Sequence, residues 1–235
     1  MEGGPPMYAS LVLLLIVPGA EANEAEQLFR QMEAKVMKAK NVGCTFETNT
    51  DVGVPVQNSM KGTLLIADGN KFWSEAKIVV PDKMDTVTMV SDGSKMVMRS
   101  GAFSVKPEDV PKRFGEAVRA SFIRCGLLAP MLIMGKIGDN EFKADDVWQV
   151  ADFKLGKKAM VGQDEAQLIE YTLTIKKPQE LTVMMTVWID TKTQLPLKRV
   201  ARGTTAELKI TVTETYSKWS LDEKIDPKQF ELPKE

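Results

Sequence analysis

The chain has 235 residues, of which 43% are hydrophobic and 27% are charged; this composition is typical of a globular protein and excludes a disordered chain. Its 31 basic and 32 acidic residues nearly cancel, so electrostatics give no reason to expect a nucleic-acid partner. The chain contains no histidine, which excludes catalytic triads built on histidine and ordinary zinc ligation.

Residues 1–22 have the pattern of an export signal. The apolar stretch at 8–17 has the length of a signal-peptide core and is too short to cross a bilayer as a helix. Ala20 and Ala22 supply the small residues that signal peptidase reads, although no Lys or Arg precedes the apolar stretch. A buried N-terminal helix is the alternative. We expect export, with 23–235 remaining as one soluble periplasmic domain.

The mature chain begins with a predicted helix over 23–40. Asn23 can cap this helix, and Glu26 three residues later completes a capping box. Apolar residues recur at helical spacing and would form one buried face, namely Ala25, Leu28, Phe29, Met32 and Val36.

The period of the apolar residues then changes to two, which predicts antiparallel strands joined by tight turns at 68–70 and 91–94. A helical insert is expected at about 107–135, with Pro107 and Pro111 in its first turn. Strands are expected to resume at 147–155, 157–162, 167–177, 181–190 and 206–219, with a hairpin over 187–202 that keeps its Lys and Arg side chains outside.

About eleven antiparallel strands in one sheet must curl, because strand twist accumulates across the sheet. We therefore expect an α+β fold that is mainly antiparallel β. It would be a curled, open half-barrel of about eleven strands, with helices covering its concave face and the insert acting as a lid.

No constellation of catalytic residues is visible. The chain has no glycine-rich phosphate-binding motif. Its densest acidic cluster, at 139–146, lacks the spacing of a calcium loop. We expect no catalysis, no metal and no cofactor; an enzyme acting through paired carboxylates is the least favoured alternative.

The two cysteines, Cys44 and Cys125, leave two interpretations open. In an oxidising compartment they could form a disulfide, and closing so long a loop would stabilise the protein by roughly 4 kcal/mol. Alternatively they are two buried thiols, since cysteine packs readily in protein cores.

The chain is rich in methionine, with 14 residues. Methionine is soft and unbranched, so it suits a surface that adapts to varied apolar ligands, although it also fills irregular cores. The two tryptophans Trp73 and Trp188 fall on the face opposite part of the apolar register of their strands, which would fit a concave side that is also apolar.

Several local motifs in a fixed order run from Ala25 to Pro233: the first helix, a strand bearing Phe46, Gly62-Thr63-Leu64, Asn70-Lys71-Phe72 with Glu75, Val90-Ser91-Asp92-Gly93, Trp188-Ile189-Asp190 with Leu195-Pro196, and Phe230-Glu231-Leu232-Pro233. Together they resemble the LolA/LolB-like lipoprotein carrier superfamily. Trp73 stands where that family often has an arginine, and no arginine lies in the first two strands. The resemblance implies an open eleven-stranded barrel that shields lipid acyl chains in the periplasm, without catalysis.

On this resemblance we expect a hydrophobic cavity lined by Phe46, Leu64, Phe72, Trp73, Met89, Met98, Phe122, Met131, Met134 and Trp188. The expected function is a monomeric periplasmic carrier for the acyl chains of a lipid or lipoprotein. Its partners would be lipoprotein-handling proteins of the inner or outer membrane. The alternative is a sensor or interaction module on the same fold, which would regulate an envelope response through a membrane-protein partner.

Overall fold

The structure is a computed structural model that describes residues 23–53, 58–80, 83–101, 104–127, 142–176, 180–204 and 209–233. Its elements in chain order are α1 (Glu24–Lys38), β1 (Asn41–Asp51), β2 (Asn58–Ala67), β3 (Lys71–Val80), β4 (Lys83–Asp92), β5 (Lys95–Arg99), β6 (Glu108–Asp109), α2 (Phe114–Cys125), α4 (Ala144–Val147), β7 (Trp148–Val161), β8 (Asp164–Ile175), β9 (Leu181–Asp190), β10 (Pro196–Thr204), β11 (Lys209–Leu221) and the short 3-10 helix η1 (Pro227–Phe230).

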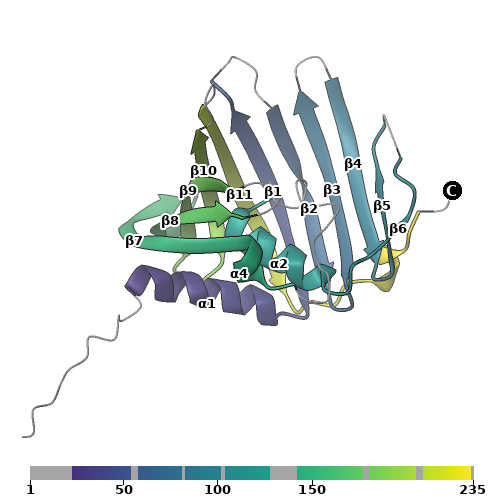
Figure 1. Ribbon diagram of the computed structural model, residues 1–235, viewed down its shortest axis with the longest axis horizontal. Helices are drawn as coiled ribbons and strands as arrows, with labels where there is room; N and C mark the ends of the chain where they lie inside the picture. The colour runs from purple at the N-terminus through teal and green to yellow at the C-terminus, as the bar shows by residue number, and fades with distance from the viewer. Residues whose placement is uncertain are drawn as a thin grey trace, which may run out of the picture.

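All eleven strands belong to one sheet, in the order β6-β5-β4-β3-β2-β1-β11-β10-β9-β8-β7. The two edge strands, β6 and β7, do not pair with each other, so the sheet is open. Figure 1 shows that the sheet curls, with β7 and β8 passing in front, and that α1, α2 and α4 lie near one end of the strands. The expected fold class, an open half-barrel of eleven antiparallel strands with helices on its concave face, is confirmed.

The first helix forms as its sequence predicts. The side chain of Asn23 accepts a hydrogen bond from the Glu26 backbone at 3.0 Å, which satisfies one of the free N–H groups of the first turn. The buried face of α1 packs on β7 and β8, where the Phe29 ring lies 5.1 Å from Phe153 and 4.8 Å from Tyr171. Helix α1 therefore fixes the curled end of the sheet.

The structure differs from the expected elements in two places. Residues 107–113 do not begin the helix, because Glu108–Asp109 form strand β6 and pair with β5 instead. The segments 147–155 and 157–162 are one strand, β7, whose register shifts twice against β8. These bulges break the period-two pattern without ending the strand, so five strands rather than six follow the insert.

Gly62 in β2 is required by close packing, because a Cβ atom there would lie 2.8 Å from Ala76 Cα, 2.9 Å from the Phe46 ring and closer still to the Glu75 carbonyl oxygen. We expect Gly62→Ala to lower the free energy of unfolding by about 1–3 kcal/mol, since backbone atoms must move. Urea denaturation measures this. Gly203→Ala in β10 is the matched control, since no atom of the described residues lies within 4 Å of its added Cβ. Equal stability of the two variants would contradict the steric explanation.

Among the described residues, no helix has both the length and the hydrophobicity needed to cross a membrane.

Candidate functional site

The side of β2–β5 that faces the helices carries a row of apolar side chains. Residues directly opposite in an antiparallel pair share a face, and the register places Met60 opposite Ile78 and Met89 opposite Met98. The same face continues through the neighbouring pairs of β3, β4 and β5. We name this surface the methionine face and define it as Met60, Phe72, Ile78, Val87, Met89, Met96 and Met98.

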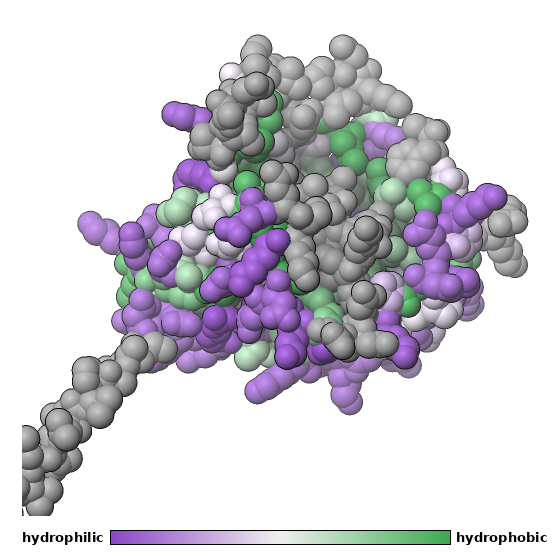
Figure 2. All heavy atoms as spheres, in the orientation of Figure 1, coloured by the Kyte–Doolittle hydropathy of each residue, from purple (hydrophilic) through white to green (hydrophobic). Residues whose placement is uncertain are grey.

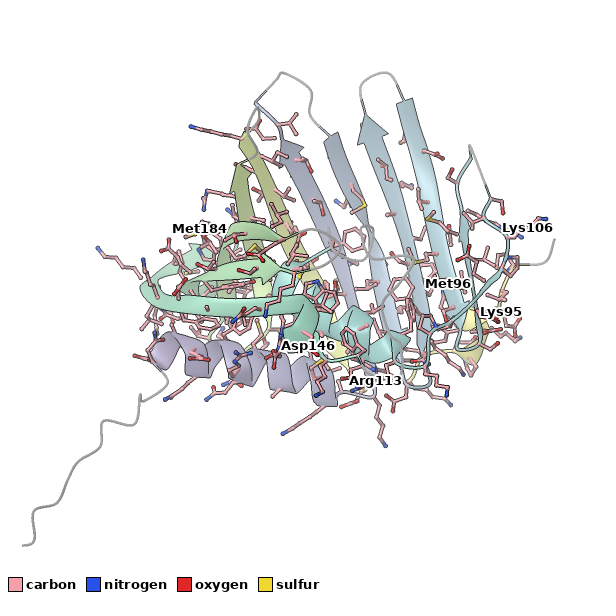
Figure 3. The ribbon with its side chains drawn as sticks, in the orientation of Figure 1. Lys95, Met96, Lys106, Arg113, Asp146 and Met184 are labelled. Carbon is pink, nitrogen blue, oxygen red and sulfur yellow. The ribbon has the colours of Figure 1, made fainter. Side chains whose placement is uncertain are left out.

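The methionine face is covered only in part by the described residues. Phe72 and Met89 are 3% and 8% exposed, and the Phe72 ring contacts Phe114 of α2 edge-on at 6.1 Å. Met60, Met96 and Met98 are only partly buried. Figure 2 shows hydrophobic residues on this side of β3–β5, beyond the helices, and Figure 3 shows Met96 on β5. Met60 and Ile78 lie toward the end of the strands away from α2, whereas Met96 lies opposite Ser91, next to Phe72 at the α2 end. The face is therefore only partly covered along its length.

Helix α2 is held at its C-terminal end by side chains from three strands. Arg199 of β10 donates to the Phe122 and Ile123 carbonyls at 2.9 and 2.6 Å. Tyr171 of β8 donates to the Arg124 carbonyl at 2.8 Å. These carbonyls belong to the last turn of α2, where partners outside the helix are needed and positive charge is favourable.

Glu214 of β11 completes this arrangement, which we call the Arg199 clamp (Arg199, Tyr171, Glu214 and Tyr216). The Glu214 carboxylate accepts from the Leu127 backbone at 2.9 Å and lies 3.6 Å from Arg199, and Tyr216 donates to it. Arg199 and Glu214 are 1% and 2% exposed. Burial disfavours the charged guanidinium, but Tyr216, Tyr171 and Glu214 outweigh it and raise the pKa of Arg199. Arg199 therefore keeps its positive charge in the core, 3.6 Å from the Glu214 side chain.

Asn70, in the turn between β2 and β3, holds the N-terminal end of α2. Its side chain accepts from the Gly115 backbone at 2.9 Å and donates to the Lys112 carbonyl at 3.0 Å. Asn70 has φ 61°, a conformation that asparagine tolerates better than most residues. The described part of the expected lid is therefore anchored to the sheet at both of its ends.

A third set of contacts ties α2 to the other helices. Arg124 donates to Glu33 of α1 and to Asp145 of α4, each at 2.5 Å. The hydrogen bond from Arg124 lowers the pKa of the Asp145 carboxyl despite partial desolvation. Figure 3 shows Arg113 at the start of α2 and Asp146 within α4, both on the helix side of the sheet.

The structure brings together most of the expected cavity residues. Phe46, Leu64, Phe72, Met89 and Phe122 belong to one buried core cluster, and Met98 packs against it. Met131 and Met134 lie outside the described residues. Cys44 and Cys125 are buried, free thiols, and burial raises the pKa of both.

The two tryptophans do not belong to this face, contrary to the expectation. Trp188 lies between the core residues Val187 and Ile189, so the alternation of the strand places its ring on the outer face. There the ring packs 4.9 Å from the Lys198 ammonium group. Trp73 follows the core residue Phe72 and likewise points outward.

Sequence reasoning missed the Arg199 clamp. Arg199 was expected outside the 187–202 hairpin, but it is buried on the inner face, while Arg202 is exposed. Lys198 and Arg199 are consecutive, so one of the two has to point inward in a regular strand. The strand phase of Glu214 could have predicted its burial, because Glu214 points to the same side of β11 as Val212 and Tyr216, which are both buried.

The chain was compared with protein families, curated proteins and solved structures. A family model described as predicted periplasmic protein (DUF2092) matches residues 25–234. Among curated proteins, no sequence matches the chain. The solved structure of LprF from Mycobacterium bovis is 13% identical with a TM-score of 0.51, covering 83% of this chain and 92% of LprF.

Two further solved structures are similar at lower scores. Lipoprotein LppX from Mycobacterium tuberculosis is 11% identical with a TM-score of 0.48, covering 85% of this chain and 96% of LppX. A LolA superfamily protein from Nitrosomonas europaea is 8% identical with a TM-score of 0.38, covering 88% of this chain and 97% of that protein. The similarity to LprF shows a shared fold, as the motif resemblance predicted. By this match over residues 25–234, the chain belongs to the family of predicted periplasmic proteins DUF2092 and is a periplasmic protein.

Proposed function

We propose that this protein binds the acyl chains of a lipid or lipoprotein on the methionine face and carries them through the periplasm. The observation that supports this proposal is the partly exposed apolar surface formed by Met60, Met96 and Met98 on the concave side of an open sheet. A monomeric protein gains nothing by keeping such a surface free unless an apolar partner covers it.

The chemistry of the face suits a long aliphatic chain. Each methylene group removed from water contributes about 0.8 kcal/mol, so a long acyl chain offers roughly 10 kcal/mol. Methionine side chains adjust their shape to such ligands at little cost because they are flexible and polarisable.

The anchoring of α2 decides where the ligand enters. Residues 114–127 are held by Asn70 at one end and by the Arg199 clamp at the other. The acyl chain would therefore reach the methionine face from the end of the sheet opposite to α2, and α2 would form the closed end of the site.

Two measurements test the proposal on the mature protein. Lipids extracted from the purified protein are identified by mass spectrometry, and uptake of a fluorescent fatty acid is titrated. We expect co-purified lipid and saturable uptake. Absence of both would refute the proposal.

A matched pair of variants locates the binding surface. Met60→Glu puts a charge on the methionine face, whereas Met84→Glu puts the same charge on the outer face of the same end of the sheet. We expect Met60→Glu to weaken fatty-acid binding about tenfold or more, because a carboxylate on an apolar surface opposes acyl contact. Met84→Glu should bind as wild type. Met60→Leu, which conserves the apolar character, should also bind normally, and equal weakening by all three variants would contradict the assignment.

A further inference from the structure

The outer face of the sheet carries exposed apolar residues at one end. Val79 of β3 and Met84 of β4 lie directly opposite each other and are 44% and 70% exposed. Both point away from the helices, since their neighbours Ile78 and Asp85 face the concave side. Two large apolar side chains at directly opposed positions and with this much exposure are unusual on the solvent-facing side of an antiparallel sheet.

Two lysines stand next to this apolar pair. Lys61 of β2 and Lys77 of β3 are directly opposite each other on the same outer face, and both are exposed. Like charges at directly opposed positions destabilise a sheet. Lys61 reaches Glu47 at 3.4 Å, but both side chains are open to solvent, so the pair contributes little. Within the sheet itself the two lysines therefore bring no evident gain in stability.

The same strand ends are also apolar on the concave side, where Met60 lies opposite Ile78. At the end farthest from the helices (Figure 1), strands β2–β4 thus carry apolar side chains on both faces: Met60 and Ile78, next to Asp85, on the concave face, and Val79 and Met84 on the outer face. A surface that combines exposed apolar side chains with adjacent basic ones is complementary to an anionic lipid bilayer, which attracts the cations and accepts the apolar groups at its interface.

We propose that Lys61, Lys77, Val79 and Met84, here named the docking edge, bind the surface of an anionic lipid bilayer. Met60 and Ile78 lie on the opposite, concave face at the same end of the strands, beside the bilayer contact. The bilayer contact stands without acyl binding, but its use for loading or unloading a ligand rests on the function proposed above.

Sedimentation with lipid vesicles tests the docking edge on the mature protein. We expect binding to vesicles of phosphatidylglycerol mixed with phosphatidylethanolamine, weakened by added salt, and much weaker binding to phosphatidylcholine vesicles. Lys61→Glu/Lys77→Glu should weaken binding to the anionic vesicles about 30-fold or more, and Met84→Glu about tenfold. Equal binding to both kinds of vesicle, or no binding to either, would overturn the proposal.

Matched variants on the opposite edge of the sheet provide the control. Lys154→Glu/Lys157→Glu changes two exposed lysines of β7, and Met184→Glu changes a methionine of β9 that is 52% exposed. These variants should bind vesicles as wild type does. If they lose as much binding as the docking-edge variants, the loss is explained by the change in net charge alone, and the assignment of the docking edge is wrong.

The same measurements distinguish a bilayer from a second copy of the chain as the partner of the docking edge. They also test membrane docking independently of acyl-chain binding. If Met84→Glu abolishes concentration-dependent dimerisation without any vesicle binding, the edge contacts a second copy of the chain and the bilayer proposal is wrong. Fatty-acid uptake is read independently in solution. Vesicle binding by Met60→Glu with loss of uptake supports both assignments, whereas uptake without vesicle binding refutes docking only.

Discussion

Arg199→Ala is expected to lower the free energy of unfolding by about 3–5 kcal/mol, because it leaves the buried Glu214 carboxylate without its cation. The same change removes the hydrogen bonds from Arg199 to the Phe122 and Ile123 carbonyls at the end of α2. Urea denaturation followed by tryptophan fluorescence measures the loss. Hydrogen exchange should show a larger increase in exchange rate, relative to wild type, in α2 than in β2–β4.

Two controls separate the ion pair from a simple loss of side-chain volume. Arg202→Ala removes an exposed arginine from the same strand and should change stability by no more than about 0.5 kcal/mol. Arg199→Met/Glu214→Leu replaces both charges by apolar groups and should recover much of the loss, because no isolated charge remains buried. A single Arg199→Ala variant as stable as wild type would show that the clamp does not hold the helix.

Phe29→Ala is expected to destabilise the protein by about 3–5 kcal/mol, because it opens a cavity between α1 and the curled end of the sheet. Phe29 is 0% exposed and its ring packs against Phe153 and Tyr171. Thermal and urea denaturation measure the change. Tyr171 also donates to the Arg124 carbonyl, so loosening of this ring cluster should extend to the end of α2.

Phe29→Leu is the matched variant for this position. It retains an apolar side chain of moderate volume and should cost well under half of the alanine variant. Comparable losses for the two variants would indicate that the aromatic contacts, rather than the filled volume, carry the stabilisation.

The architecture could be predicted from the sequence because its signals are local. The helical spacing of Phe29, Met32 and Val36 and the capping by Asn23 are properties of short segments, and the structure reproduces them. The period-two pattern likewise located most strands. The sequence predicted two strands on either side of Gly156 where the structure has the single strand β7. The two register shifts of β7 interrupt the period-two pattern, but its pairing with β8 continues.

The site could be predicted only in part, since it depends on contacts between distant segments. Phe46, Phe72, Met89 and Phe122 were placed on one side because their apolar character already assigns them to the core. Trp73 and Trp188 were misplaced because aromatic character was given more weight than strand phase. Arg199 was assigned to solvent by its charge, whereas its partner Glu214 and the carbonyls of α2 become neighbours only through the fold.

The position of β1 between β2 and β11 has a consequence for how the protein reaches its native state. The Phe46–Tyr216 pairing joins parts of the chain that are separated by most of its length, and β1 has its full set of backbone partners only after the last strand arrives. Closing such a long loop costs entropy before any contact is gained, which slows folding. Until then the backbone N–H and C=O groups on one edge of β1 are unpaired, and the protein is most vulnerable to aggregation during that interval.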